Sequence, residues 1–564
     1  MLRYSTTKTS LIGKLSNACL RSLSSNIQQS PFGPLPAAPT DLLSDFIAHD
    51  WAKCGDRTFI HEGITNSSLT YAELTNRTAN FAASMADEVS PAGSGRTTAT
   101  VFSPNHVDYL PLVAGFLRAG GIVSPANPLY TEYELRGQIE KSKSTILIAH
   151  PAMLETAMKA VKGTDIKKVI VLGDSDCGVA GAVPFDSLAS SHANPIMSTP
   201  DYVKTAVSPA DLALLPFSSG TTGLPKGTML SHQNITINLQ QFEAPEGKYM
   251  SPNSTLISPL PMFHIYGFTA SLLHTAKKSN TLVTMANFDL PRFCELVQEF
   301  KPERAHLVPP IILGIAKHPI IDNYDFSSLK MVISAAAPLG AEVEAGVRER
   351  LNIGCKQAWG MSELSPVGTV TPDDNLKSGS GTIGPVVSGS EGKIVDLETG
   401  EALPPGESNT GELCIRGPQV MMGYLDEPEK TRECLTSDGW LHTGDIAYVD
   451  EDGYYFIVDR LKELIKYKGF QVAPAELEAV INTNPKVADC AVIPVEDAQG
   501  GEVPRAYAVK SGDIDDDELL AYVEERVSPH KKLRGGVVWV DEIPKSAAGK
   551  ILRRVVIDMD RSKN

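Results

Sequence analysis

The chain has 564 residues, of which 42% are hydrophobic and 21% are charged. This composition excludes wholesale disorder, and the length predicts three to four domains or subdomains at about 150 residues each. The 51 Lys and Arg against 67 Asp and Glu give a net charge of −16, which argues against a nucleic-acid partner because that binding depends on clustered positive charge. No apolar run approaches the roughly 18 residues of a membrane-spanning helix, so stable membrane insertion is not expected.

The first 40 residues differ from the rest of the chain. They carry four basic residues, many Ser and Thr and no Asp or Glu, and they end in a proline-rich stretch over residues 31–39. A basic, serine-rich and acid-free N-terminus is typical of a mitochondrial transit peptide. A tail without a targeting function can have the same composition. Two interpretations therefore stand: a mitochondrial presequence over residues 1–40, or a tail on a cytoplasmic protein.

From residue 41 onward, strand-like apolar runs alternate with helix-like segments. The strand-like runs include residues 145–149, 169–172, 213–217 and 330–335, and the helix-like segments include residues 290–299 and 341–351. This alternation predicts layered α/β structure with largely parallel sheets.

After residue 381 the pattern changes to short strands separated by turns, at residues 392–395, 411–417 and 453–458. These strands predict a small β-rich subdomain at the end of a large N-terminal domain, residues 41–460. Residues 461–564 predict a compact α+β domain with helices at residues 474–482 and 515–527. The expected fold class is α/β, with a large layered domain and a small C-terminal domain.

The most informative stretch joins a predicted strand to a predicted helix. It contains Ser218, Ser219, Gly220, Thr221, Thr222, Gly223 and Lys226. The glycines allow turns that direct backbone N–H groups inward, and the hydroxyls and the lysine add hydrogen-bond donors, which together suit a polyphosphate. The stretch is not a Walker A loop, because GxxxxGK[ST] occurs nowhere in the chain. A flexible surface linker is the plain alternative, although few linkers place so many hydroxyls directly after a strand.

This stretch resembles the phosphate loop of the adenylate-forming superfamily, which includes acyl-CoA synthetases, 4-coumarate–CoA ligases, beetle luciferases and the adenylation domains of peptide synthetases. Four further motifs of the superfamily follow in the same order. They are QAWGMSE at residues 357–363, TGD at 443–445, DRLKELIKYKG at 459–469 and PKSAAGKILRR at 544–554. Five motifs in order identify the chain as a member of the superfamily, closest in pattern to 4-coumarate–CoA ligase and its relatives.

The resemblance implies a binding site for ATP and AMP along these motifs. In the family the aromatic residue, here Trp359, stacks on adenine, and the hydroxyl, here Ser362, meets the α-phosphate. The family's glutamate, here Glu363, helps to hold Mg²⁺, and its aspartate, here Asp445, binds the ribose hydroxyls. An indole offers a large π face and a carboxylate a hard oxygen ligand, which suit these roles. The other nucleotide-binding residues implied are Gln357, Ala358, Gly360, Arg460, Lys462 and Lys466.

The resemblance also implies a mobile C-terminal domain that rotates about a hinge at Lys462 between two half-reactions. Lys550, with Ser362 and Glu363, is the implied catalytic group of the first, and Lys468 and Gly469 face coenzyme A in the second. The expected reaction joins a small-molecule carboxylic acid to CoA through an acyl-adenylate, releasing AMP and pyrophosphate. It needs no protein nucleophile, because positioning and electrostatics carry phosphoryl chemistry of this kind.

The acyl substrate is less determined than the nucleotide. The resemblance places the segment around His264 in the acyl pocket, although a lone histidine is usually a structural residue. The other candidates are Tyr266, Gly267, Ala335, Ala336, Ala337, Pro366 and Val367. Small alanines leave room for an aromatic ring or an alkyl chain. The sequence therefore leaves open an aryl-propenoic acid such as 4-coumarate and a medium- or long-chain fatty acid.

Two other functions use the same adenylation step. A luciferase-like monooxygenase passes the adenylate to O₂ instead of CoA. An amino-acid-activating enzyme normally needs an acidic partner for the substrate ammonium, and residues 260–268 contain no acid. CoA ligation is the favoured function, carried out by a monomer or a weak homo-oligomer.

Overall fold

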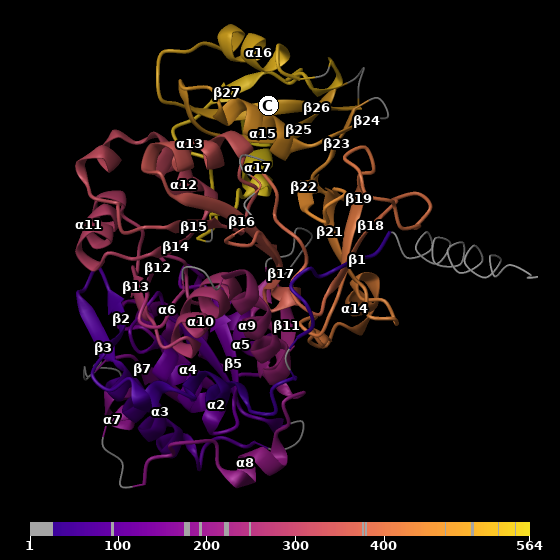
Figure 1. Cartoon of the computed structure of the whole chain (residues 1–564). Helices are drawn as coiled ribbons and strands as arrows, with labels where there is room; N and C mark the ends of the chain where they lie inside the picture. The colour runs from indigo at the N-terminus through magenta and orange to yellow at the C-terminus, as the bar shows by residue number, and fades with distance from the viewer. Residues whose placement is uncertain are drawn as a thin grey trace, which may run out of the picture.

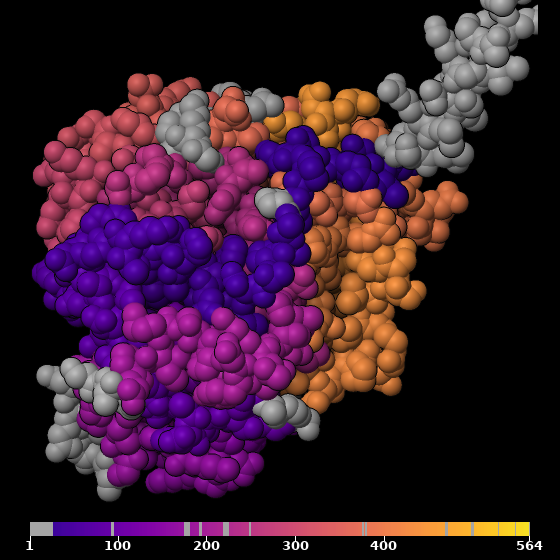
Figure 2. Space-filling view, turned by 60° about the horizontal axis from the view of Figure 1, so that its bottom comes forward, coloured from indigo at the N-terminus to yellow at the C-terminus, as the bar shows by residue number. Residues whose placement is uncertain are grey.

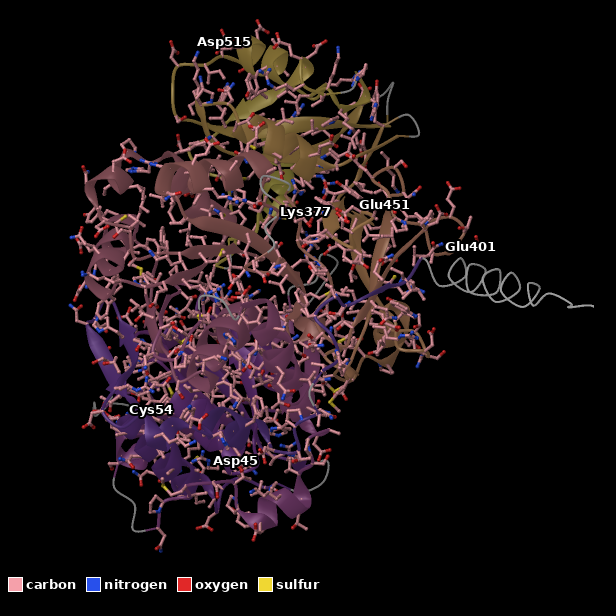
Figure 3. All side chains as sticks on the ribbon, in the orientation of Figure 1. Asp45, Cys54, Lys377, Glu401, Glu451 and Asp515 are labelled. Carbon is pink, nitrogen blue, oxygen red and sulfur yellow. The ribbon has the colours of Figure 1, made fainter. Side chains whose placement is uncertain are left out.

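A computed structural model describes residues 26–563, apart from residues 36, 92–94, 174–180, 191–193, 219–224, 247–249, 375–376, 378–380, 468–469, 498–500, 528 and 548. Figure 1 shows a large layered body and a smaller C-terminal unit, coloured yellow, that sits on one end of it. Charged side chains such as Glu401, Glu451 and Asp515 extend from the outer surface (Figure 3). Among the described residues, no helix combines the length and the apolar character that crossing a membrane requires.

The first of two large sheets has the order β10-β11-β9-β5-β4-β6-β7-β8, with β20 added to β11. Its strands are β4 (Thr98–Phe102), β5 (Ile122–Ala126), β6 (Ile146–Ala149), β7 (Lys168–Val171), β8 (Ala182–Pro184), β9 (Leu212–Leu214), β10 (Phe217–Ser218), β11 (Lys226–Ser231) and β20 (Gly423–Tyr424). Strands β4 to β8 are parallel, and β4, β5 and β6 are buried along their whole length. Helices on both faces account for that burial.

The second large sheet has the order β17-β16-β15-β14-β12-β13-β2-β3. Its strands are β2 (Thr58–Glu62), β3 (Ser67–Thr70), β12 (Thr255–Ile257), β13 (Thr281–Thr284), β14 (Arg304–Leu307), β15 (Met331–Ser334), β16 (Gly354–Gly360) and β17 (Val367–Val370). Strands β14, β15 and β16 are parallel, so their carboxyl ends meet at one edge of the sheet. Ligands bind at such edges in open α/β sheets.

Helices cover these two sheets. They are α2 (Leu43–Ala48), α3 (Tyr71–Met85), α4 (Tyr109–Arg118), α5 (Glu132–Ser142), α6 (Leu154–Ala160), α7 (Phe185–Ala189), α8 (Asp201–Ala206), α9 (His232–Glu246), α10 (His274–Lys277), α11 (Leu290–Phe300), α12 (Pro309–Lys317), α13 (Ala341–Leu351) and α14 (Pro428–Cys434). A π-helical segment, η4 (Tyr266–Leu273), precedes α10. Helices α3 and α5 begin at capping boxes, Thr70 with Glu73 and Thr131 with Glu134, which satisfy N–H groups that a helix start leaves free.

The predicted β-rich subdomain is an antiparallel sheet. Its strands are β1 (Gln28–Gln29), β18 (Glu391–Val395), β19 (Gly411–Arg416), β21 (Leu441–Val449) and β22 (Tyr455–Arg460). Strand β1 comes from the N-terminal segment that the sequence analysis grouped with the tail. Gln28 pairs with Gly392, and the Asn26 side-chain amide donates to the Ala402 carbonyl at 2.7 Å. Figure 2 shows this indigo segment lying against the orange subdomain, so residues from 26 onward belong to the folded body.

The C-terminal unit is a five-stranded sheet with three helices. Its elements are β23 (Ile465–Tyr467), β24 (Phe470–Val472), β25 (Val487–Asp497), β26 (Gly501–Lys510), β27 (Val537–Trp539), α15 (Pro474–Asn482), α16 (Asp516–Glu524) and α17 (Arg553–Lys563). Leu477, Ile481, Val492, Leu519 and Val523 are buried together in a core that belongs to this unit alone. The unit therefore packs like a small domain of its own.

Most predicted elements are confirmed. Helices α13 and α15 have the predicted bounds, and β6, β7, β15 and β18 lie within a residue of the expected runs. The helix predicted at residues 515–527 is shorter, Asp516–Glu524, and the run at residues 213–217 is divided between β9 and β10. A strand stands where a helix was expected to follow directly. The missed strand, β11, follows the glycine-rich stretch and pairs antiparallel with β10. Its sequence, KGTMLS, has neither an apolar run nor clean alternation, so pairing with its neighbours, rather than local pattern, accounts for this strand.

Candidate active site

A cavity of about 500 Å³ lies at the carboxyl ends of β15 and β16, where the large body, the β-subdomain and the C-terminal unit meet. This volume is within the usual range for small-molecule sites. The cavity brings together predicted residues from all the motifs that the structure describes. Those that line it are Lys226, His264, Tyr266, Ala335, Ala336, Ala358, Trp359, Gly360, Ser362, Glu363, Pro366, Val367, Asp445, Arg460, Lys462 and Lys550.

Four predicted site residues are not in the cavity wall: Gly267, Ala337, Gln357 and Lys466. The Gln357 amide is turned away and exchanges hydrogen bonds with the backbone of Leu339 at 3.0 and 3.2 Å. A Cβ at Gly267 would lie 2.3 Å from the carbonyl oxygen of Pro261, so this glycine is needed for close backbone packing. Both residues support the wall from behind, which their sequence context could not reveal.

Several predicted residues lie outside the described part of the chain. They are Ser219, Gly220, Thr221, Thr222, Gly223, Lys468 and Gly469, together with the side chain of Ser218. Their assigned roles in phosphate and CoA binding stay predictions.

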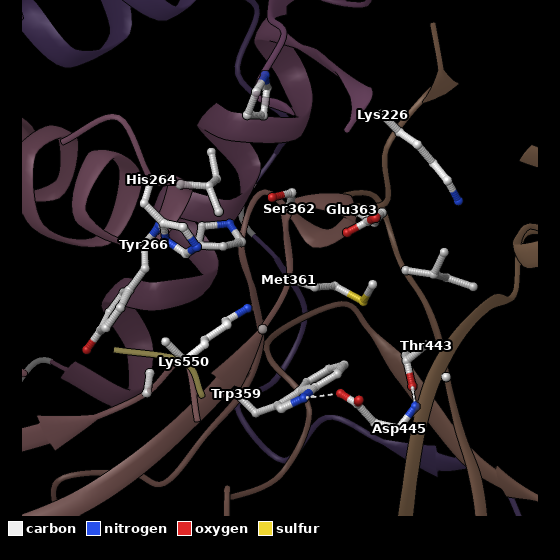
Figure 4. Close-up of a pocket in the computed structure, with 18 of the residues that line it drawn as sticks. Lys226, His264, Tyr266, Trp359, Met361, Ser362, Glu363, Thr443, Asp445 and Lys550 are labelled. Atoms are coloured by element: carbon white, nitrogen blue, oxygen red, sulfur yellow. Dashed lines mark hydrogen bonds between the residues drawn. The ribbon is translucent and has the colours of Figure 1, made fainter. Parts of the chain in front are cut away.

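Asp445 is held between an indole and a guanidinium. The Trp359 Nε1–H donates to Asp445 Oδ2 at 2.8 Å (Figure 4). Arg460 Nε lies 3.2 Å from Asp445 Oδ1. Strands β21 and β22 place Asp445 directly opposite Arg460. Burial raises the pKa of the Asp445 carboxyl, while Arg460 and the Trp359 hydrogen bond oppose that rise. The result is a carboxylate of fixed orientation that is 7% exposed at the cavity wall.

Glu363 is positioned by a tyrosine that the sequence analysis missed. The Tyr424 hydroxyl donates to Glu363 Oε1 at 2.6 Å, and Lys226 Nζ lies 4.7 Å from the centre of the Tyr424 ring. Tyr424 belongs to β20, which pairs with the strand that begins at Lys226. Three segments distant in sequence thus place a carboxylate and an ammonium on one wall, with the second oxygen of Glu363 free of this hydrogen bond.

Lys550 reaches the cavity from the C-terminal unit. Ser546 holds its backbone, because the Ser546 N–H donates to the Lys550 carbonyl at 2.8 Å and the Lys550 N–H donates to Ser546 Oγ at 3.1 Å. Burial and nearby Arg460 lower the pKa of the Lys550 ammonium to about 8, against the opposing effect of Asp445 and Glu363. The lysine is therefore mostly charged at neutral pH and loses its proton under mildly alkaline conditions.

His264 lies beside Lys550 in the wall (Figure 4). Burial, with a smaller contribution from the charge of Lys550, lowers the pKa of the His264 imidazole to about 3. Its Nδ1 accepts a hydrogen bond from the Tyr266 N–H at 3.3 Å. His264 is therefore a neutral ring that shapes the wall near the lysine, and it carries no charge toward a substrate.

Contacts from different parts of the C-terminal unit dock it on the large body. Lys317 of α12 donates from Nζ to the Asn482 carbonyl at 2.7 Å. Gly549 packs against Val308, the residue after β14, so closely that a Cβ on Gly549 would lie 2.9 Å from Val308 Cγ2. This docking holds the loop that carries Lys550 at the cavity.

The end of the cavity away from Asp445 is apolar. Phe242, Tyr266, Ile333 and Val367 line it, and the Tyr266 ring stacks on His306 with centroids 6.1 Å apart. Behind this wall a buried group of four charges pairs internally. Arg304 binds Glu246 and Asp373, and Lys356 binds the same two carboxylates at 2.7 and 2.8 Å. The group has no net formal charge, so it offers no unbalanced charge to a ligand.

Among the described residues, one group of His, Cys and carboxylate side chains has donor atoms close enough for a metal ion: Glu412, Cys414 and His442. His442 Nδ1 is already hydrogen-bonded to Glu412 Oε2 at 2.7 Å, and Glu412 Oε1 accepts from the Gly444 N–H at 2.9 Å. Burial raises the pKa of the Cys414 thiol to about 12, so the thiolate that a metal prefers is scarce. We read the group as an anchor for the turn that carries Asp445.

Comparison with known proteins agrees with this geometry. The family model "AMP-binding enzyme" matches residues 47–425, and "AMP-binding enzyme C-terminal domain" matches residues 476–550. The chain is 38% identical to 4-coumarate:CoA ligase 1 of Petunia hybrida over 523 residues, which cover 91% of this chain and 93% of the relative. It is 37% identical to 4-coumarate–CoA ligase 2 of Nicotiana tabacum over 521 residues, with 91% and 93% covered.

Solved structures share the whole architecture. The anthranilate CoA ligase AuaEII in complex with anthranoyl-AMP superposes with a TM-score of 0.82 at 21% identity, covering 92% of this chain and 97% of that one. ATP-bound MatB from Rhodopseudomonas palustris superposes with a TM-score of 0.79 at 26% identity, covering 92% and 99%. The motifs, the two-part fold and the family matches agree: the chain belongs to the AMP-binding enzyme family and is an acyl-CoA synthetase-like member of the adenylate-forming superfamily.

Proposed function

We propose that this protein is an AMP-forming carboxylic acid–CoA ligase that works through an acyl-adenylate. The observation that carries the proposal is the convergence of Lys550, Trp359, Asp445 and Glu363 on one cavity that continues into an apolar end. Such a site can hold a nucleotide, a carboxylate and an acyl group together. ATP and CoA are the co-substrates, and the relatives named above are CoA ligases.

In the first half-reaction the substrate carboxylate attacks the α-phosphorus of ATP and pyrophosphate leaves. Asp445, fixed by Trp359 and Arg460, can accept hydrogen bonds from the ribose hydroxyls, and the Trp359 ring can stack on adenine. Lys550 in its charged form stabilises the negative charge that gathers between the carboxylate and the α-phosphate, with Ser362 as a hydroxyl donor. Holding the carboxylate and ATP in a reactive orientation within one site accelerates the reaction further.

Glu363 suits a magnesium ion. Magnesium takes oxygen ligands and usually binds one or two carboxylates together with substrate phosphates. Tyr424 occupies only Oε1 of Glu363, and Lys226 lies on the same wall as a second phosphate-facing group. A bound Mg²⁺ would neutralise charge on the phosphates there.

In the second half-reaction the CoA thiol attacks the acyl carbonyl and AMP leaves. We propose that residues 461–564 turn about Lys462 between the two steps as a unit distinct from residues 41–460, removing Lys550 and bringing Lys468 and Gly469 to the CoA side. The separate core of the C-terminal unit supports its motion as one body. Lys462 lies in the cavity wall, two residues after Arg460, which ends the last strand of the large body.

The apolar end favours an uncharged hydrophobic acyl group. Phe242, Tyr266 and Ile333 supply aromatic and branched surface there, and the described lining of that end has no acid that could pair with a substrate ammonium. The small side chains Ala335 and Ala336 leave room for a flat ring. With relatives named as 4-coumarate–CoA ligases, an aryl-propenoic acid is the first candidate and a medium- or long-chain fatty acid the second.

The test is a panel of carboxylic acids with pyrophosphate release as the readout. The panel contains 4-coumarate, cinnamate, fatty acids of increasing length, an amino acid and a dicarboxylic acid, each with ATP, Mg²⁺ and CoA. We expect release with the aryl-propenoic or fatty acids and formation of the CoA thioester. CoA-independent release of light or CO₂ would overturn the ligase assignment, and preference for the amino acid or the dicarboxylic acid would overturn the proposed substrate class.

Two further proposals rest on the sequence alone. We propose that the basic N-terminal residues direct the protein to mitochondria, which the composition supports. We also propose a monomer or a weak homo-oligomer in solution, which light scattering on the purified chain measures directly.

A further inference from the structure

Three segments far apart in sequence meet beside the strand that begins at Lys226. Lys141, in the last turn of α5, donates from Nζ to the Pro225 carbonyl at 3.2 Å. Lys143, just after α5, forms an ion pair of 2.8 Å with Asp426 in the turn between β20 and α14. The end of α5, the start of β11 and the turn before α14 are thereby joined at one place.

Lys430 projects from α14 into the cavity wall at this junction. It lines the cavity with Lys226 and Tyr424, and the Tyr424 N–H donates to Thr431 Oγ1 at 2.9 Å, which ties α14 to β20. Lys430 Nζ lies 2.8 Å from Glu427 Oε1, and the two side chains are 41% and 39% exposed. Because an exposed ion pair contributes little free energy, an incoming anion with more charge can take the place of Glu427.

The positive charges of three lysines act on the Glu427 carboxyl. Its direct hydrogen bond from Lys430 is the largest effect that lowers the pKa of the Glu427 carboxyl, and Lys141 and Lys226 lower it further. Glu427 therefore contacts Lys430 directly and lies in the positive field of lysines from two other segments. A polyphosphate in the cavity would meet Lys430 and Lys226, which both line it.

We propose that Lys430, with Lys226, binds the pyrophosphate end of ATP and receives pyrophosphate as it leaves, and that Glu427 competes for Lys430 and speeds the release. The proposal rests on the AMP-forming reaction proposed above, in which pyrophosphate is a product. The nucleoside end is held elsewhere in the cavity, by Asp445 and Trp359. Lys430 should thus distinguish ligands that carry the β- and γ-phosphates from AMP, which lacks them.

Isothermal titration of the full chain with three probes, MgATP, Mg-pyrophosphate and AMP, tests this. Lys430→Ala should weaken binding of MgATP and Mg-pyrophosphate by about three- to tenfold and leave AMP unchanged, the size expected for one charge-assisted contact at a partly exposed site. Glu427→Gln should act in the opposite direction and tighten Mg-pyrophosphate, since it frees Lys430 without removing a lysine.

Arg432→Ala is the matched control, because Arg432 lies on the same helix, carries the same charge and is exposed outside the described cavity wall. It should leave all three affinities unchanged, and an equal midpoint of thermal unfolding shows that each variant folds. Equal pyrophosphate affinity in Lys430→Ala and wild type, or an equal loss of AMP affinity, would overturn the assignment of Lys430. Wild-type protein that binds neither AMP nor MgATP would overturn the proposed function itself.

Discussion

At the scale of single residues, the site depends on Lys550 and on the charges around it. Burial and Arg460 favour the neutral amine, while Asp445 and Glu363 favour the ammonium, and the pKa of about 8 reflects that balance. Lys550 is therefore cationic at neutral pH, and a modest rise in pH removes its proton. The same residue can stabilise the adenylation transition state and still be sensitive to pH.

Lys550→Ala should separate the two half-reactions. One preorganised cation at the developing charge is worth roughly 10²–10³ in rate, so ATP-dependent formation of the adenylate should fall by that factor. Conversion of supplied acyl-AMP and CoA to the thioester should be nearly unchanged, because Lys550 is not needed once the adenylate exists. The two rates are measured separately, by pyrophosphate release and by thioester formation.

The charge of Lys550 also predicts a pH profile. Its pKa is lowered, so the protonated form is present below about pH 8 and is lost above it, and kcat/KM for MgATP should fall as pH rises through that value. Lys545→Ala is the control, because Lys545 lies on the same loop and is paired with Asp489 at 2.6 Å.

A Lys550→Ala variant that loses both half-reactions equally, or one that loses neither, would contradict the step-specific role.

At the scale of elements, the docking of the loop before α17 decides whether Lys550 reaches the cavity. Gly549 has φ +76° and lies against Val308, so a side chain there meets both a strained backbone and a close neighbour. Gly536, in the same unit, has φ +80° with no heavy atom within 4 Å of a built Cβ. Both glycines have a positive φ, but only Gly549 of the two lies in close contact with another residue.

Gly549→Ala should therefore slow adenylation by about tenfold or more, since a displacement of about 1 Å near a reacting centre can cost a hundredfold. Gly536→Ala brings the same backbone strain without the contact and should leave the adenylation rate close to wild type. Thioester formation from acyl-AMP should survive in both variants. An equal loss of adenylation rate in the two variants would show that Gly549 is required for its backbone conformation and not for its close contact with Val308.

The sequence could predict elements whose pattern is local, and it missed contacts made between elements. Helix α13 runs from Ala341 to Leu351 as predicted, because its apolar spacing and its flanking residues are contained in one segment. Tyr424, Glu412 and Lys430 were missed because each acts through a partner elsewhere in the fold. The Trp359–Asp445 hydrogen bond spans 86 positions, and neither motif alone indicates that the indole N–H orients the aspartate.

At the scale of the whole molecule, the N-terminal segment is part of the body from residue 26. Strand β1 pairs with β18, Ile27 packs beside Trp440, and Leu35 packs against Gly389. Residues between 26 and 35 therefore pack against the β-subdomain that carries Asp445 and Arg460. The segment with transit-peptide composition, residues 1–40, therefore includes residues that pack in the folded body.

Two truncations test this division. Deletion of residues 2–25 should leave the thermal unfolding midpoint and the adenylation rate unchanged. Deletion of residues 2–40 should lower the midpoint, since each large apolar side chain removed from its packing costs up to about 1.5–3 kcal/mol. Equal midpoints for the two truncations would show that β1 contributes nothing to stability. A reporter fused to residues 1–40 that stays in the cytosol would contradict the mitochondrial proposal.

The most direct test of the central claim follows the oxygen atoms of the substrate. An accepted acid with both carboxylate oxygens labelled with ¹⁸O is incubated with ATP, Mg²⁺ and CoA, and the products are separated for mass spectrometry. Attack of the carboxylate on the α-phosphorus, followed by attack of CoA on the acyl carbonyl, leaves one labelled oxygen on AMP and none on pyrophosphate. Labelled inorganic phosphate together with ADP would instead show an acyl-phosphate route, and it would contradict the acyl-adenylate mechanism.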